Sequence, residues 1–241
     1  MASKGTKGKL KTRNGKPLEL YLIRISPACR AVWFYLLQNN IPHVLIDVDF
    51  TKGETTLPDV LLRNSHQEVP LLVDGDYIIF EGPPILNYLA QTYTNHAGFG
   101  SNQSTRLATE SVISWANSEL HRVIGYGYIY PQFLEKYAVP SEHLNDAIVD
   151  KGLRHVTQKL EILEGRYLSK NKYLTGKTLT MADIFVATVV AQLQWTGSKS
   201  QMWPNVIEWL SRVQKVEFWE EVHASHRQYV QELTGGRILV H

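Results

Sequence analysis

The stretch that most limits the fold is "VPLLVDGDYIIF" at residues 69–80, two short apolar runs joined by Asp74-Gly75. An Asp-Gly pair between two such runs is a strong signal for a tight turn between antiparallel strands. Upstream, strand-like runs at 18–23 ("LELYLI") and 43–50 ("HVLIDVDF") flank the apolar helical run "CRAVWFYLLQNN" at 29–40. A helix between two strands favours a parallel crossover. The chain therefore predicts a mixed sheet with helices packed on it.

The chain after this hairpin is helical in pattern. The helical run "PPILNYLAQTYT" follows directly, then a Gly/Asn/Ser cluster that is typical of a linker, and then helical periodicity to the end. We expect four parts, which are a basic, disordered leader over 1–17, an α/β domain over 18–95, a linker over 96–104, and an all-helical domain over 105–241.

Three expectations concern the helical part. Its first helix has Ser104 as an N-cap candidate and two glycines, Gly125 and Gly127, at which it is expected to bend. The apolar run at 180–195 ("TMADIFVATVVAQLQW") predicts a buried central helix, because it has no polar face.

Composition excludes several classes of protein. The 241 residues are 44% hydrophobic and hold one cysteine, Cys29, so no disulfide framework exists and a reducing compartment is favoured. No apolar run is long enough to span a membrane. The net charge of +2 comes from the first 17 residues, which hold six of the 25 basic residues and no acid. The remainder carries 19 basic against 23 acidic residues, with no basic patch that favours nucleic acid.

The first candidate site is Ser26, in "ISPACRAV", at or beside the start of the first helix. Free N–H groups and a partial positive charge at a helix start stabilise a thiolate. Ser26 could donate a hydrogen bond to a sulfur brought by a ligand. The alternative is that Ser26 is only an N-cap, which its residue type favours when it is taken alone. Cys29, one turn further on, is interpreted as a buried structural thiol.

The second candidate site is Val69-Pro70, immediately before a strand. A cis bond here would leave the N–H and C=O of Val69 free to pair with an extended peptide. Cis X-Pro bonds are rare, so the residues alone favour the trans form.

The third candidate site is Glu81-Gly82, at the start of the next helix. Helix-start N–H groups suit an anion, and the Glu81 carboxylate suits an ammonium group. Together they match the α-amino acid end of a small molecule. The alternative is an ordinary helix start with an exposed acid.

The remaining motifs carry no chemistry of their own. Thr180 and Asp183 form a capping-box pattern that favours a stability role. The nine histidines are scattered, no metal site is indicated, and no phosphate-binding glycine loop occurs.

These features, in this order, resemble the glutathione transferase family over residues 18 to about 232. The stretch "LELYLIRISPACRAV" is similar to the first strand and helix of the theta class, which uses a serine. The stretches "VPLLVDGDYIIFEGPPILNYLA" and "LTGKTLTMADIFVA" match two further family motifs. The resemblance implies a thioredoxin-like N-terminal domain, an all-helical C-terminal domain, a cis Pro70, a cytoplasmic location and a homodimer.

The resemblance also implies roles for particular residues. Ser26 would lie beside the sulfur of glutathione, the co-substrate, and the thiolate would attack an apolar electrophile. Positions matching the family's glutathione contacts are Thr55, Glu68, Val69, Pro70, Glu81, Gly82 and Glu110. Here Gly82 replaces the family's serine, and Thr55 and Glu68 replace groups that are usually donors. Trp115, Tyr126 and Tyr130 are candidates for the electrophile pocket, although Trp115 equally suits the helical core. An alternative function is a binding protein that carries an apolar ligand between the domains with little or no conjugation activity.

Overall fold

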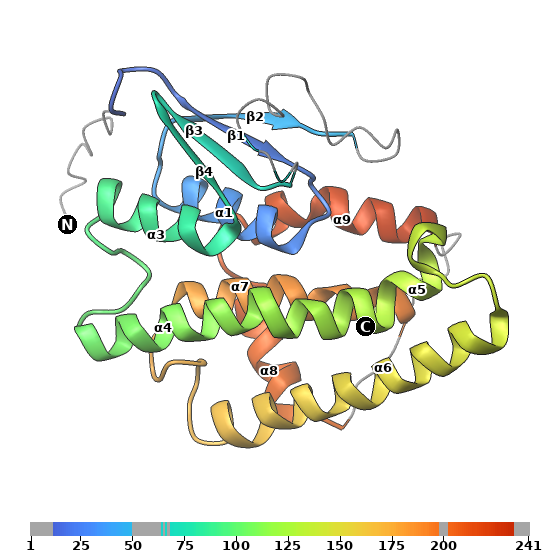
Figure 1. Cartoon of the computed structure of the whole chain (residues 1–241). Helices are drawn as coiled ribbons and strands as arrows, with labels where there is room; N and C mark the ends of the chain where they lie inside the picture. Colours follow the sequence, from blue (N-terminus) through green and yellow to red (C-terminus); the bar gives the residue numbers. More distant parts are fainter. Residues whose placement is uncertain (1–11, 50–63, 65, 67, 198–201, 234–241) are drawn as a thin grey trace.

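The computed structural model describes residues 12–49, 64, 66, 68–197 and 202–233. A four-stranded sheet lies at the top of Figure 1, with α1 and α3 between it and a layer of C-terminal helices. The elements of the first part are β1 (Leu18–Leu22), α1 (Pro27–Gln38), β2 (His43–Asp47), β3 (Leu71–Asp74), β4 (Tyr77–Phe80) and α3 (Gly82–Tyr93).

The sheet is mixed, as the sequence predicts. Its strand order is β2-β1-β3-β4. Strand β1 pairs in parallel with β2, with Leu18 opposite His43, and antiparallel with β3. Strands β3 and β4 form the expected hairpin, in which Gly75 has a φ of 62°, a left-handed conformation that glycine adopts without strain. The β1–α1–β2 crossover therefore positions the start of α1 at the end of β1.

The α1 helix is the centre of the fold. Ten of its twelve residues are buried, and it packs between the sheet and α7. It begins at Pro27, two residues before the predicted start, because proline at the first position needs no N–H partner. It ends at Gln38, where Asn40 takes a left-handed φ of 52°.

The C-terminal part is helical, with several π and 3₁₀ segments. Its elements are α4 (Gln103–Trp115), π segments Ala116–Leu120 and Arg122–Ile129, α5 (Tyr130–Phe133), a 3₁₀ turn Glu135–Tyr137, α6 (Glu142–Ile162), a π segment Leu163–Tyr167, α7 (Met181–Val190), a 3₁₀ segment Ala191–Thr196, α8 (Pro204–Val213) and α9 (Trp219–Leu233).

Two details of these helices differ from the sequence prediction. Helix α4 is capped by Asn102, whose side chain accepts from the Thr105 N–H at 3.0 Å, and not by Ser104. The apolar run at 180–195 is not one α-helix, since α7 ends at Val190 and continues as a 3₁₀ segment. The two glycines at which a bend was expected lie in the π segment Arg122–Ile129.

The predicted capping box at the start of α7 is present. The buried Asp183 carboxylate accepts from the Thr180 N–H at 2.8 Å, the Leu174 N–H at 2.8 Å and Trp209 Nε1 at 2.9 Å. One carboxylate thus fixes the start of α7 to the preceding loop and to α8.

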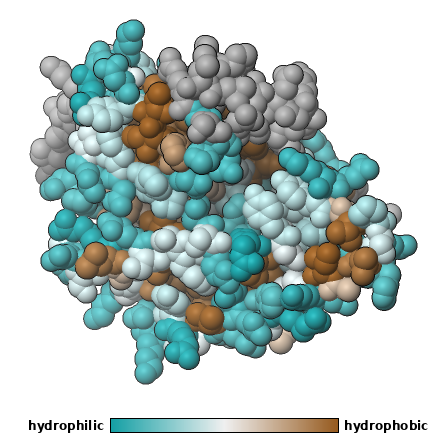
Figure 2. Space-filling model, viewed as in Figure 1, coloured by the Kyte–Doolittle hydropathy of each residue, from teal (hydrophilic) through white to brown (hydrophobic). Residues whose placement is uncertain are grey.

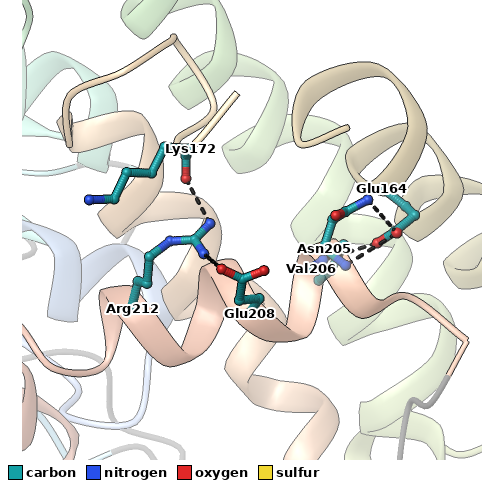
Figure 3. A network of polar contacts seen from close by, with 6 residues as sticks. All are labelled: Glu164, Lys172, Asn205, Val206, Glu208 and Arg212. Carbon is teal, nitrogen blue, oxygen red and sulfur yellow. Dashed lines mark hydrogen bonds and ion pairs between the residues drawn. The ribbon is translucent and has the colours of Figure 1, made fainter. Parts of the chain in front are cut away.

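A second carboxylate fixes the start of α8 (Figure 3). Glu164 accepts from the N–H groups of Asn205 at 3.2 Å and Val206 at 3.0 Å, and from Asn205 Nδ2 at 2.7 Å. The helix's own N-cap residue, Trp203, has no group that could do this. Further along α8, Arg212 pairs with Glu208, which lies four residues before it, and donates to the Lys172 carbonyl.

Residues 12–17 differ from the expected disordered leader. The Arg13 guanidinium lies over the Tyr77 ring, 4.1 Å from its centroid, and the Lys16 N–H donates to Asn14 at 3.0 Å. The chain is therefore attached to the β3–β4 hairpin before Leu18; the rest of the predicted leader, 1–11, lies outside the described residues. Among the described helices, none is long and apolar enough to cross a membrane.

Candidate functional site

The start of α1 leaves donors for a ligand. Ser26 is at the N-cap position with extended backbone (φ −71°, ψ 129°), but its side chain makes no capping hydrogen bond. The N–H groups of the first turn have no partner within the helix. The geometry therefore does not support the alternative in which Ser26 serves only as a side-chain cap.

The Cys29 thiol is buried behind Ser26. Burial raises its pKa to about 11, although the Ser26 hydroxyl and the Arg30 charge act in the opposite direction. Cys29 is therefore a neutral thiol at physiological pH, which agrees with its interpretation as a structural residue. It also shows that the Ser26 hydroxyl lies within reach of a sulfur atom.

The Val69–Pro70 peptide bond is cis, as the resemblance implies and contrary to what the residues alone favour. The preceding carbonyl, that of Glu68, accepts from Nδ2 of the buried Asn64 at 2.9 Å. Among the described residues, the N–H and C=O of the half-buried Val69 have no hydrogen-bond partner. These groups can pair with an extended peptide.

The third segment has strained backbone at Glu81, with φ 69° and ψ 136°. Non-glycine residues in this region cost free energy and are concentrated at functional sites. The Glu81 carboxylate accepts from Asn117 Nδ2 at 3.2 Å, so it is held by the π segment that follows α4. Asn117 was not foreseen, because nothing in the sequence pattern links two residues 36 positions apart.

The helix start at Gly82 offers fewer donors than an ordinary one. Pro83 and Pro84 have no N–H, and the Ile85 N–H donates to the Glu81 carbonyl at 3.2 Å. Gly82 therefore supplies the free N–H of this first turn. Gly82 has close neighbours: a Cβ added to it would lie 3.2 Å from the Ala28 Cβ and 3.2 Å from Phe185 Cε2. The family's serine would have to displace one of them.

Tyr126 joins this group of residues. The residue is 49% exposed, and its pKa is raised first by burial of the hydroxyl and then by Tyr137, Glu68 and Glu81. The two glutamates thus lie within electrostatic range of one tyrosine hydroxyl. Glu68 and Glu81, separated by a strand hairpin in sequence, act on the same place in space.

The three expected pocket residues do not lie together. The rings of Tyr126 and Tyr130 pack edge to face, with centroids 5.0 Å apart. The Tyr130 hydroxyl is turned into the core, where it accepts from Gln192 Nε2 at 2.6 Å and bonds His121 Nε2 at 3.0 Å. Trp115 instead stacks on Tyr167 at 6.3 Å, which is the core-packing alternative. Of the three, Tyr126 is the exposed one.

Two further candidates are placed differently. Glu110 is half-buried on α4 and lines a cavity of about 30 Å³ with Pro83, Asn87, Phe99 and Ile113. Thr55 lies outside the described residues. Within the described part of the chain, no cluster of His, Cys, Asp and Glu side chains could hold a metal ion.

A residue that the sequence reasoning passed over is Arg30, the charged residue in the apolar α1 helix. It is fully buried, and burial lowers the pKa of its guanidinium to about 9, so it remains a cation at pH 7. The signal was available, because a lone arginine in "CRAVWFYLL" cannot reach water from a helix that is apolar on every side.

The fold and the positions of these residues define a class: a thioredoxin-like domain with free peptide groups beside a cis proline, joined to a helical domain. Comparison with known proteins identifies it. The glutathione S-transferase N-terminal domain family matches residues 20–97, and the C-terminal domain family matches residues 130–217. The chain is 30% identical over 169 residues to glutathione S-transferase 3 of Zea mays, a match that covers 69% of this chain and 74% of the relative. The chain belongs to the glutathione S-transferase family.

Other relatives lie in the theta class. The chain is 29% identical to glutathione S-transferase theta-1 of Bos taurus over 206 residues, which is 82% of each protein. The structure of human glutathione S-transferase T1-1 aligns with a TM-score of 0.76 at 24% identity, covering 90% of this chain and 91% of that one. A delta-class transferase of Nilaparvata lugens aligns with a TM-score of 0.76 at 20% identity, covering 91% and 100%. These structures confirm the expected fold.

Proposed function

We propose that this protein is a glutathione transferase that binds glutathione along the edge formed by Val69, Glu81 and the start of α1. The observation that carries the proposal is the hydrogen-bonding capacity at this edge that no helix cap or strand uses. The Ser26 hydroxyl makes no capping bond and lies beside the Cys29 sulfur, and the Val69 peptide groups have no partner among the described residues. A tripeptide thiol presents the extended backbone, ammonium group and sulfur that these groups suit.

In the reaction we propose, Ser26 and the helix-start N–H groups stabilise the glutathione thiolate. The sulfur electron pair attacks an electrophilic carbon, a C–S bond forms, and the leaving group departs with its bonding pair. Glu81, held by Asn117, would pair with the ammonium of the γ-glutamyl group. Tyr126, an exposed aromatic residue within electrostatic range of Glu68 and Glu81, would contact the apolar electrophile.

The experiment is Ser26→Ala, assayed with glutathione and a panel of alkyl and activated aryl halides. Loss of one preorganised donor to a developing or stabilised anion lowers the rate by roughly 10²–10³-fold. Because Ser26 makes no capping bond, the free energy of unfolding should change by less than about 0.5 kcal/mol. Unchanged turnover together with a stability loss of about 1 kcal/mol would show that Ser26 is only a cap.

We also propose that the protein is a cytoplasmic homodimer. The support is the resemblance to its family, the single buried cysteine, and an apolar patch over β4 that Figure 2 shows, where Ile78 and Phe80 are exposed. Glu110, beside the small cavity between α3 and α4, would contact glutathione bound to the partner subunit. Light scattering measures the mass in solution. A monomer that binds glutathione as tightly after Glu110→Ala would overturn this arrangement.

A further inference from the structure

Arg30 is a buried cation without a carboxylate partner. Its side chain donates one hydrogen bond, from Nη2 to the Thr188 carbonyl of α7 at 3.0 Å. Its Nε and Nη1 atoms are buried and have no hydrogen-bond partner among the described residues. None of the ion pairs formed within the described chain includes Arg30. Burial of an unpaired charge is strongly unfavourable, so such a charge calls for an explanation.

The groups around Arg30 do not supply a counter-charge. Those within electrostatic range are Cys29 on α1, Tyr130 on α5, His121 beside the π segments, and His223 and His226 on α9. Burial keeps the Cys29 thiol and the Tyr130 hydroxyl protonated, because it raises the pKa of both. Helix α7 contributes a backbone carbonyl. No carboxylate of the described residues forms an ion pair with Arg30, and none is among the groups whose charge acts on its pKa.

The two α9 histidines are neutral as well, because the pKa of both rings is lowered, and their hydrogen bonds fit neutral rings. His223 Nδ1 must donate to the Trp219 carbonyl at 2.9 Å, which leaves Nε2 without a proton in the neutral ring. His226 Nε2 accepts from Trp195 Nε1 at 2.8 Å. Burial beside the Arg30 cation lowers the pKa of both rings, which is consistent with these tautomers.

Arg30 is close to Ser26 along α1. Its backbone N–H donates to the Ser26 carbonyl at 3.0 Å, so the two residues are one helical turn apart. Long side chains on a helix lean toward its N-terminus. The charge acts on the Cys29 thiol, which in turn lies within reach of the Ser26 hydroxyl. The cation is therefore carried by the same helix start at which the proposed function puts a ligand sulfur.

We propose that Arg30 is a positioning residue whose counter-charge arrives with the substrate: its buried, uncompensated cation stabilises the glutathione thiolate at Ser26. This inference rests on the proposed function. The anionic sulfur would supply the missing negative charge. Binding of the thiolate form would therefore remove the unfavourable free energy of the unpaired buried cation.

The experiment compares the wild type with Arg30→Met, which keeps the length of the side chain and removes its charge. The matched control is Arg24→Met, which removes the same charge two residues before Ser26 from a half-buried arginine already paired with Asp47 at 2.6 Å. The pKa of bound glutathione is measured by thiolate absorbance across a pH series. Affinities for glutathione and for S-methylglutathione, which cannot form a thiolate, are measured by calorimetry.

We expect Arg30→Met to raise the pKa of the bound thiol by roughly one unit, the effect of a unit charge about 10 Å away at an effective dielectric of about 20. Affinity for glutathione should fall by up to roughly tenfold above that pKa, and affinity for S-methylglutathione by less than about twofold. Arg24→Met should leave both nearly unchanged, because the charge of Arg24 is already balanced by Asp47 and is partly screened by solvent.

Three results would overturn the inference. Equal losses for both ligands with an unchanged thiol pKa would make Arg30 a packing residue. The same pKa shift in Arg24→Met would show a general effect of net charge. A wild type that binds neither ligand would refute the proposed function itself, and this inference with it. If Arg30→Met fails to fold, Arg30→Gln, which keeps an N–H for the Thr188 carbonyl, gives the same comparison.

Discussion

The Phe185 ring of α7 lies where a side chain at position 82 would have to go, since a Cβ on Gly82 would be 3.2 Å from its Cε2 atom. We therefore expect Gly82→Ser, which restores the family's residue, to lower the free energy of unfolding by about 1–3 kcal/mol, the usual effect of overpacking. Glutathione affinity should not improve. Combining Gly82→Ser with Phe185→Leu should recover part of the lost stability in urea unfolding. A stable single variant with tighter glutathione binding would contradict this.

A second glycine marks the closest approach between two helices. A Cβ on Gly152, in α6, would lie 1.9 Å from the Gly127 carbonyl oxygen. Because backbone cannot yield as a flexible side chain does, Gly152→Ala should cost more than about 3 kcal/mol. Gly165→Ala is the matched control, since nothing lies within 4 Å of its Cβ position. That change should be neutral or add roughly 0.5–1 kcal/mol, because alanine favours a helix. Thermal unfolding of both variants separates the two outcomes.

The Glu164 carboxylate replaces an ordinary N-cap for α8, as Figure 3 shows. We expect Glu164→Ala to lower stability by about 1–2 kcal/mol, because it leaves two helix-start N–H groups without their charged acceptor. The control is Glu208→Ala, which removes an acid from α8 itself. The Glu208 side chain is 74% exposed and pairs with Arg212. An exposed pair of this kind contributes about 0.3–0.5 kcal/mol. Equal losses in the two variants would show that the cap contributes little.

The buried histidines of α9 should make the protein sensitive to acid. Burial lowers the pKa of His223 to about 2 and that of His226 in the same direction. Since an unfolded histidine titrates near 6.5, the unfolded state binds more protons below that pH, and stability falls as the pH falls. Two such groups cost about 3 kcal/mol between pH 7.5 and 5.5. Urea unfolding at the two pH values measures this loss, and His223→Gln combined with His226→Gln should remove most of it. A wild type equally stable at both pH values would refute the prediction.

Local patterns predicted the elements of this fold well, because their signals lie within short windows. The Asp74-Gly75 turn and the capping box at Thr180 are two examples. The sequence pattern could not distinguish between neighbouring residues that can each cap a helix. Ser104 was expected to cap α4, but Asn102 does so. The cis bond at Pro70 was predicted from the family resemblance alone. Cis X-Pro bonds are so rare that the neighbouring residues by themselves favour the trans form.

Parts of the candidate site depend on contacts between segments that are far apart in the sequence. No short stretch of sequence contains both partners of such a contact. Arg30 donates to the carbonyl of Thr188, 158 positions later, and Glu81 is held by Asn117. The same holds for Gly82, whose missing side chain is explained by Phe185 and not by its sequence neighbours. The sequence indicates candidate ligand-facing residues, whereas their contacts with distant residues appear only when the two domains are packed together.

Because ten of the twelve residues of α1 are buried, the helix that presents Ser26 is also the centre of the core. Few substitutions in α1 are therefore available for adapting to a new substrate, because nearly every substitution there also changes the stability of the core. We expect naturally varying positions to gather on exposed rings such as Tyr126 and to avoid α1. The residues that activate the thiol would then stay constant because the fold requires α1. The range of accepted electrophiles would change through substitutions on the helices that face α1.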